Sequence, residues 1–501
     1  MKYKIISLVL FLFVSSNVFA AQKFSTNFNS YHLLFILLFV GIIWLTIYAL
    51  QSAIDKLNKI ISKEESPASE KLKDKVEEML QAKTVLFYCS LLFIFLFTCY
   101  AFVKGTNMES HIIEWMNLVI RWMHVLFGIA WIGASFYFVF LENALNRTTN
   151  LKEGIAGNLW AIHGGGIYFL EKYKVVPAEI PKDLHWFKYE SYFTWLSGFT
   201  LLVIVYYLDA NVYLIDPNVM VLTPVQAIAI GLGTLLLGWI VYDALCKSFL
   251  ANHQALLSVI ILLFTALVAW FLSHIFSSRA AYIHVGAMLG TIMTGNVFRV
   301  IIPGQKRMVS LAKEGKEVDP TIGQKALLRS RHNNYFTLPV IFIMISNHFP
   351  STYGSAFNWI ILIGLTIASV LIKHYLNLHE KGEKSVWILP VGIALILSLA
   401  FITRPITKSV CKEDALATFT EVNAIIQERC VSCHSANPTD EVIKVAPNNI
   451  MFDKPEDILK FSERINQRVV ITQTMPQANK TGITQAERDI IACWIENGAQ
   501  K

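Results

Sequence analysis

The stretch Cys430-Val431-Ser432-Cys433-His434 decides how the C-terminal part of this 501-residue chain folds. Two cysteines at this spacing, followed directly by histidine, are typical of covalent c-type haem attachment. Each thiol would add to a vinyl group of the haem, and His434 would take one axial position on the iron. The stretch therefore predicts a haem c domain, with a two-cysteine metal knuckle as the alternative.

A methionine downstream is the expected second axial ligand. Met475 lies in the polar sequence Thr474-Met475-Pro476, ahead of a predicted helix that contains Cys493-Trp494-Ile495. This arrangement resembles the Met loop and C-terminal helix of small class I cytochromes c. Iron bound by histidine and methionine has a raised potential and no open position for a substrate. We therefore expect this domain to carry single electrons while another part of the chain holds the substrate.

The rest of the chain has the composition of a membrane protein. Hydrophobic residues make up 54% of the sequence, and ten apolar runs are long enough to cross a bilayer as helices. The expected fold class is all-α, a polytopic helical membrane protein with a C-terminal class I cytochrome c domain. The ten runs are residues 33–50, 84–103, 112–141, 191–208, 224–242, 255–275, 281–302, 335–349, 357–375 and 386–402.

The N-terminus has the layout of a secretory signal peptide. Lys2 and Lys4 precede an apolar run that ends in small residues at Ala20. We expect cleavage after Ala20, with an uncleaved anchor as the alternative. The predicted division of the chain is a signal peptide at 1–20, a two-helix N-terminal membrane extension at 21–105, an eight-helix membrane domain at 106–405 and the cytochrome c domain at 412–501.

The distribution of positive charge predicts the orientation in the membrane. Haem c is attached only outside the bacterial cytoplasm, and ten spans return the chain to the outside at residue 403 if it starts there. Lysine and arginine are frequent in loops assigned inside, such as 303–334, whereas loops assigned outside carry almost only Lys104 and Arg279. We expect a protein of the bacterial inner (cytoplasmic) membrane with a periplasmic cytochrome domain. The net charge of +7 then reflects orientation, and no nucleic-acid partner is predicted.

The remaining cysteines have different expected roles. Cys89, Cys99 and Cys246 fall in predicted spans and are expected to pack there. Cys411 and Cys493 both belong to the part of the chain assigned to the oxidising compartment, where a disulfide between them could form. The sequence alone leaves this pairing open.

Two histidines stand on otherwise apolar helices, toward the outer side. His124 shares a helix face with Arg121 and Trp131, and His284 precedes Gly286 and Gly290. Polar groups inside a bilayer are costly and usually functional. Each histidine could be a packed residue bonded to a carbonyl group, or the two could ligate a haem b in the membrane domain.

A second polar group gathers toward the inner side. It includes His163-Gly164-Gly165-Gly166, Asn296, Arg299, His332 and Asn333. Each has an ordinary explanation: Arg299 can extend to the lipid headgroups, Asn333 can cap a helix, and the glycines can form a turn.

Eight short motifs follow one another along the chain: Ile120–His124, Trp131–Tyr137, Trp160–Gly166, His185–Lys188, Thr194–Gly198, His284–Met288, Gly295–Phe298 and His332–Tyr335. Taken together and in order, these motifs resemble the membrane-bound urate oxidase (urate hydroxylase) family, which has a C-terminal cytochrome c domain. The resemblance covers residues 112–501 and does not extend to residues 1–105.

The resemblance implies oxidation of urate to 5-hydroxyisourate in purine degradation, with the new hydroxyl taken from water. Electrons would pass one at a time to the tethered haem c and on to the respiratory chain, through a soluble cytochrome c or a terminal oxidase. We expect four catalytic residues near urate: His163, Arg299, His332 and Asn333. His124 and His284 would be electron-path residues or haem b ligands.

A haem-containing electron-transfer subunit without a metabolite substrate is the alternative. Such a quinol or cytochrome relay would need paired histidines on facing helices at two depths. The loops that share the family motifs would have no purpose in a pure relay.

Overall fold

The computed structural model describes residues 30–61, 76, 79–80, 83, 87, 108–148, 150–177, 179–181, 183–404, 411 and 417–501. The predicted signal peptide, nearly all of the span at 84–103, and both Cys89 and Cys99 lie outside these residues. The chain forms two units, residues 1–116 and 117–501, and each is described by itself. In the first unit, helix α2 (Ser30–Ile61) covers the predicted span at 33–50.

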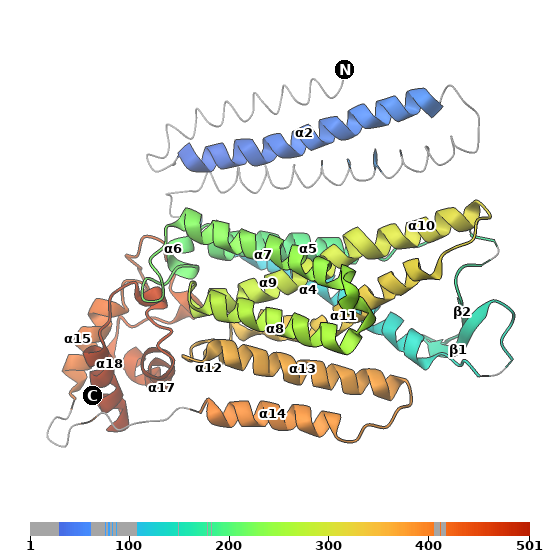
Figure 1. Ribbon diagram of the computed structural model, residues 1–501. Helices are drawn as coiled ribbons and strands as arrows, with labels where there is room; N and C mark the ends of the chain where they lie inside the picture. Colours follow the sequence, from blue (N-terminus) through green and yellow to red (C-terminus); the bar gives the residue numbers. More distant parts are fainter. Residues whose placement is uncertain are drawn as a thin grey trace. The chain divides into compact units, whose positions relative to one another are not determined.

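Residues 109–404 form long helices, and the part from residue 117 onward is called the bundle here (Figure 1). Two of the long helices, α5 and α9, continue directly into π-helical turns, η1 and η3. The helices are α4 (Glu109–Ala144), α5 (Tyr189–Leu202), η1 (Val203–Tyr207), α6 (Ala210–Tyr213), α7 (Pro224–Lys247), η2 (Phe249–Asn252), α8 (Gln254–Ser273), α9 (Ser278–Asn296), η3 (Val297–Ile301), α10 (Ile302–Lys313), α11 (Pro320–Ser346), α12 (Pro350–Tyr353), α13 (Asn358–Glu380) and α14 (Ile388–Ile402).

Five helices in the described part of the chain are long and apolar enough to cross a membrane, by length and composition. The other three runs predicted between residues 112 and 402 coincide with helices that are shorter or more polar: α5 with η1, α11, and α14. The chain is therefore compatible with a multi-pass membrane protein. The five are residues 111–144, 224–247, 254–273, 278–313 and 358–380.

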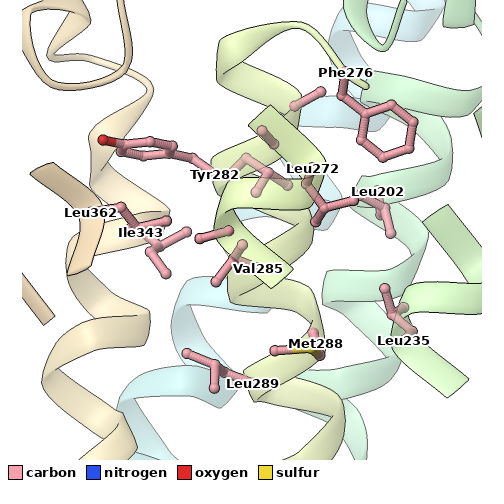
Figure 2. Packing of buried hydrophobic residues seen from close by; sticks show 14 of the residues in the cluster. Leu202, Leu235, Leu272, Phe276, Tyr282, Val285, Met288, Leu289, Ile343 and Leu362 are labelled. Carbon is pink, nitrogen blue, oxygen red and sulfur yellow. The ribbon is translucent and has the colours of Figure 1, made fainter. Parts of the chain in front are cut away.

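Helix α9 lies in the interior of the bundle and packs against α5, α7, α8 and α11. Its side chains Val285, Met288 and Leu289 are at most 1% exposed, and they pack among apolar residues of the neighbouring helices (Figure 2). Because α9 is covered on most of its faces, polar residues on it are also buried. His284 and Asn296 are both fully buried for this reason.

The described part of the chain is mostly helical, as predicted, and a two-stranded β-hairpin between α4 and α5 is a departure from the all-α prediction. Strand β1 (Ile155–His163) pairs antiparallel with β2 (Gly166–Tyr173). The two residues between the strands, Gly164 and Gly165, have positive φ angles of 57° and 79°. Glycine adopts this backbone region without steric cost, and a two-residue Gly-Gly connection is a common hairpin turn. Gly164 and Gly165 therefore form a turn, which is the ordinary explanation given for them from the sequence.

The C-terminal domain, residues 417–501, consists of short helices around an apolar core. Capping boxes start both of its longer helices, Thr418 with Glu421 at α15 and Thr484 with Glu487 at α18. The core includes Trp494, which is 2% exposed. The helices are α15 (Phe419–Arg429), η4 (Pro447–Asn449), α16 (Pro455–Lys460), α17 (Ser462–Ile465), η5 (Asn466–Ile471), η6 (Gln477–Asn479) and α18 (Gln485–Glu496).

Cys411 and Cys493 form a disulfide, which settles the pairing that the sequence left open. Their Cα atoms are 5.0 Å apart, and 82 positions separate them in the chain. The disulfide ties the segment before the C-terminal domain to its last helix.

The C-terminal domain and the hairpin lie at opposite ends of the bundle (Figure 1). A close approach at Gly354 joins the C-terminal domain to the bundle, because a Cβ atom there would stand 2.9 Å from Cβ of Thr472. Across the same boundary, Arg468 Nη1 donates a hydrogen bond of 3.4 Å to the hydroxyl of Tyr353.

Candidate functional site

The four predicted haem c residues lie around one cavity. Cys430, Cys433, His434 and Met475 all line a cavity of about 860 Å³ between the C-terminal domain and the bundle. Cofactor and ligand sites in proteins have volumes of roughly 300–1,000 Å³. The structure thus brings together residues that are more than 40 positions apart in the sequence.

The local fold leaves these side chains available to a cofactor. Helix α15 ends at Arg429, so Cys430 follows at its C-terminus, and both Cys430 and Cys433 are free thiols. His434 Nδ1 is 2.9 Å from the carbonyl oxygen of Ile450, a contact that fixes the ring and leaves Nε2 free to bind a ligand.

The methionine loop is held by its backbone. The amide of Met475 donates to the carbonyl oxygen of Arg468 at 3.0 Å, and Arg488 donates to the carbonyl oxygen of Met475 at 2.9 Å. Two thiols, one imidazole and one thioether at one cavity are the donor set that a covalent haem c requires.

A second site candidate is a buried polar network inside the bundle. Helix α11 contributes Arg329, His332 and Asn333, α9 contributes Asn296, and α7 contributes Tyr242 and Asp243. All except Asp243 are less than 9% exposed. Asn296, His332 and Asn333 belong to the inner polar group predicted from the sequence, and the structure brings them together.

Asn296 is the centre of this network. Its Nδ2 donates to Asn333 Oδ1 at 2.9 Å and to the Tyr242 hydroxyl at 3.0 Å, and its Oδ1 accepts from Arg329 Nη1 at 3.1 Å. The Tyr242 hydroxyl is also 2.8 Å from His332 Nδ1. Every polar group of Asn296 therefore has a partner, which fixes its orientation.

Arg329 is paired with a carboxylate. Its Nη2 donates to Asp243 Oδ1 at 2.7 Å, and the arginine side chain is only 4% exposed. Buried charges need such pairing. Arg329, Tyr242 and Asp243 were not among the residues predicted from the sequence. The spacing of three and four residues from Arg329 to His332 and Asn333, which puts them on one helix face, could have indicated Arg329.

Two of the predicted catalytic residues are not part of this network. His163 is exposed at the end of β1, next to the hairpin turn, and Arg299 is exposed on η3. The structure therefore brings together His332 and Asn333 of the four predicted residues, and places His163 and Arg299 elsewhere on the surface. The hairpin directs His163 away from the helices, and the turn of η3 places Arg299 outside while Asn296 points inward.

The two outer histidines are packed residues in this structure. His284 has both ring nitrogens engaged, Nδ1 with the carbonyl oxygen of Ala280 at 2.9 Å and Nε2 with the Tyr207 hydroxyl at 3.1 Å. A Cβ atom at Gly286 would stand 2.5 Å from Cγ2 of Ile343, whereas one at Gly290 would have no atom within 4 Å. With both ring nitrogens engaged, His284 has no nitrogen free to ligate a haem b in this structure.

His124 is also held by its neighbours. Its Nδ1 is 3.0 Å from the carbonyl oxygen of Thr194 and 3.2 Å from the hydroxyl of Ser197. Gly198 packs directly on the ring, since a Cβ there would be 2.8 Å from His124 Cε1. Both His124 and His284 are thus packed residues bonded to a backbone carbonyl group, which was one of the two interpretations given from the sequence.

A small cavity of about 10 Å³ adjoins the buried network. It lies among Trp131 and Ser135 of α4, Met293 of α9, and Asn333 and Thr337 of α11. Its volume is about that of one water-sized probe. Trp131, which belongs to the polar face predicted on α4, therefore lines the same small cavity as Asn333.

Comparison with known proteins identifies the bundle. Residues 110–404, more than half of the chain, match the family described as urate oxidase N-terminal. The chain belongs to this family, which confirms the urate oxidase-related family to which the motifs pointed. No curated protein and no solved structure gives a significant match.

Proposed function

We propose that this protein oxidises urate to 5-hydroxyisourate and passes the electrons to a haem c in its C-terminal domain. Family membership suggests an oxidoreductase acting on urate. The observation that carries the finer proposal is the shared cavity: the family-matched bundle forms one wall, and Cys430, Cys433, His434 and Met475 form the other. Substrate oxidation and electron acceptance would then occur in two parts of one chain that are in contact.

The reaction balances without oxygen. Urate and one water give 5-hydroxyisourate, two protons and two electrons, so the new C5–O bond is formed with oxygen from water. The protein must hold the purine, accept protons and provide an exit for electrons.

His332 is the residue best placed to accept a proton. In the neutral tautomer with the proton on Nδ1, the His332 ring donates to the Tyr242 hydroxyl, 2.8 Å away. The lone pair on Nε2 is then available to act as a base. Asn333, the next residue in α11, lines the small cavity, and its amide group can bond the polar edge of a purine. Because that cavity has only about 10 Å³, urate would enter by displacing neighbouring side chains.

Arg329 is a positioning residue in this proposal. Asp243 already neutralises it, and its second contact, to Asn296 Oδ1, fixes the amide that orients Asn333 and Tyr242. Its charge is therefore not free to bind the urate anion directly.

In the C-terminal cavity, Cys430 and Cys433 would hold the haem covalently, and His434 and Met475 would bind its iron. The haem would supply a one-electron redox centre. The chain supplies the rest: Ile450 orients the His434 ring, and Arg488 holds the backbone of the Met475 loop.

We further propose that the C-terminal domain is periplasmic and the hairpin cytoplasmic, in a bacterial inner membrane. Their positions at opposite ends of the bundle support this orientation. The Cys411–Cys493 disulfide supports an oxidising compartment for the C-terminal domain. The same arrangement would expose the haem to a soluble cytochrome c or a terminal oxidase.

The test is the origin of the product oxygen. Purified full-length protein with urate and an artificial one-electron acceptor, in ¹⁸O-labelled water without O₂, should give 5-hydroxyisourate with one labelled oxygen. Pyridine haemochrome analysis of the same sample should give only the c-type spectrum. Two b haems for each c haem, with no labelled product, would favour the electron relay.

A further inference from the structure

The cavity between the bundle and the C-terminal domain is strongly cationic. Asp216 is the one acidic residue in its lining, against six arginines and a lysine. An anionic ligand, or an anionic part of a ligand, would suit these walls. The basic residues are Arg121, Arg279, Arg429, Arg464, Arg468, Arg488 and Lys480.

Some of these charges are already used by the protein. Arg429 forms an ion pair with Glu487, and Lys480 forms one with Asp440. Arg488 donates to backbone carbonyl groups that shape the methionine loop. The four remaining arginines, Arg121, Arg279, Arg464 and Arg468, have no ion pair with a carboxylate among the described residues. Of these, Arg468 makes a contact across the domain boundary, and Arg279 is held by Asn347 and two tyrosines.

Arg279 is a fixed, half-buried cation on the bundle side. Its Nε donates to Asn347 Oδ1 at 3.0 Å, and its guanidinium carbon lies 5.8 Å and 6.0 Å from the ring centroids of Tyr206 and Tyr213. It stands in the first turn of α9, where the helix dipole adds positive potential. Several contacts thus hold the charge at the cavity wall.

Arg468 faces the same cavity from the C-terminal domain. Its hydrogen bond to the Tyr353 hydroxyl crosses the boundary between the two parts. Close by, Gly354 packs against Thr472 so tightly that a Cβ atom would not fit. The two arginines are therefore held by a closely packed boundary.

We propose that the two carboxylate groups of the cofactor in this cavity are bound across the domain boundary, by Arg279 of the bundle and Arg468 of the C-terminal domain. The inference rests on the proposed function, because haem c is the ligand with two carboxylates that the cysteine motif implies. Guanidinium groups suit carboxylates because they offer paired N–H donors. The bundle thereby completes the haem site, and haem binding helps to fix the C-terminal domain against it.

The test is the reduction potential of the haem in full-length protein. Arg279→Gln and Arg468→Gln each remove a positive charge that favours the reduced, more negative haem. Each should lower the potential by about 59 mV, a tenfold change in the one-electron equilibrium constant. Arg279→Lys keeps the charge and should restore most of the potential. Arg299→Gln removes an exposed arginine that does not line the cavity, and should leave the potential unchanged.

The outcomes separate this inference from the proposed function. Wild-type protein without covalent haem would overturn both. Normal haem content with unchanged potentials in both glutamine variants would overturn the carboxylate site alone, and would show that Arg279 only packs against its tyrosines. Because the two arginines belong to different domains, Arg468→Gln gives an independent result if Arg279→Gln does not fold.

Discussion

Arg329 and Arg299 carry the same charge in opposite surroundings. Arg329 is 3% exposed and paired with Asp243, whereas Arg299 is exposed on the outside of the bundle. Removing Arg329 would leave Asp243 with Lys247 as its ion-pair partner and would take away the donor to the buried Asn296 Oδ1, so an effect on activity could not be separated from an effect on folding. His332 gives a cleaner test of the buried network, because its neighbours keep other partners.

We expect His332→Ala to slow urate-dependent reduction of the haem by roughly 10²-fold, the size of a lost general base. The haem spectrum should not change, because His332 does not line the cofactor cavity. Stopped-flow absorbance under anaerobic conditions measures the rate. Arg299→Ala is the matched control and should keep the wild-type rate. Equal rates for both variants would exclude His332 as the base.

Glu487 links a helix cap to an ion pair in the C-terminal domain. Its Oε2 accepts from the Thr484 amide and hydroxyl, and its Oε1 accepts two hydrogen bonds of 3.0 Å from Arg429. The Thr484 amide, together with Arg429, lowers the pKa of the Glu487 carboxyl despite some burial. A carboxyl whose pKa is lowered by folding stabilises the fold above its unfolded pKa, about 4.3, and this is lost as pH falls through the folded value.

Glu487→Gln should therefore lower the free energy of unfolding by roughly 1 kcal/mol at pH 7, and the difference should shrink below pH 4. Glutamine can still cap the helix, as Gln226 does at α7, so the loss reports the ion pair. Denaturation followed by haem absorbance measures it. Glu421→Gln, in a capping box without an arginine, should cost less. A difference that does not depend on pH would refute the assigned role of the charge.

The sequence predicts sites made of residues that are close in the chain better than sites made of residues from separate helices. The haem c residues were predicted together because a five-residue motif and one methionine define the chemistry. The buried network depends on how α7, α9 and α11 pack, which the sequence does not specify. The sequence therefore pointed to His332 and Asn333, which belong to the network, but not to Tyr242 and Asp243. It also grouped His163 and Arg299 with them, which the structure places outside the network.

At the scale of elements, close glycine contacts set the packing of the bundle. A Cβ at Gly231 of α7 would stand 2.8 Å from Nε2 of His284 and 2.7 Å from the Tyr207 hydroxyl. A side chain at this position would push α7 away from α9. Contacts of this kind explain why His284 is packed so closely by its neighbours.

The disulfide is the element-scale feature of the C-terminal domain with the largest expected effect on stability. It closes a loop of 82 positions, and cross-links of this type contribute roughly 2–4 kcal/mol, mainly by restricting the unfolded chain. In the double variant Cys411→Ser with Cys493→Ser, the free energy of unfolding should fall by this amount, so that the protein unfolds at a lower denaturant concentration. The haem should still be attached. Wild-type protein treated with a reductant should match the double variant. Unchanged unfolding in both samples would show that the disulfide contributes no stability.

The apolar runs predicted the helices between residues 109 and 404 well, because a long hydrophobic segment in a bilayer has few alternatives to a helix. The hairpin was missed, although Gly164-Gly165 between two aromatic-containing segments is a hairpin signal. The charged and polar residues around it suggested a loop. The π-helical turns η1 and η3 have no sequence pattern that we could identify.

On the scale of the whole molecule, the account requires the two ends of the bundle to face different compartments. A phosphatase that is active only in the periplasm should be active when fused after Lys501. It should be inactive when fused to a chain cut at Glu314, which follows α10 near the hairpin end. Activity at both positions would mean that the number or direction of the spans is wrong.

The central claim is that the bundle oxidises urate and the C-terminal haem receives the electrons. The most direct measurement is anaerobic addition of urate to oxidised, full-length protein while the absorbance of haem c is recorded. We predict reduction of the haem, with half a molecule of 5-hydroxyisourate formed for each haem reduced, because urate gives up two electrons. A haem that stays oxidised with urate but is reduced by a quinol would contradict the claim and identify the protein as an electron relay.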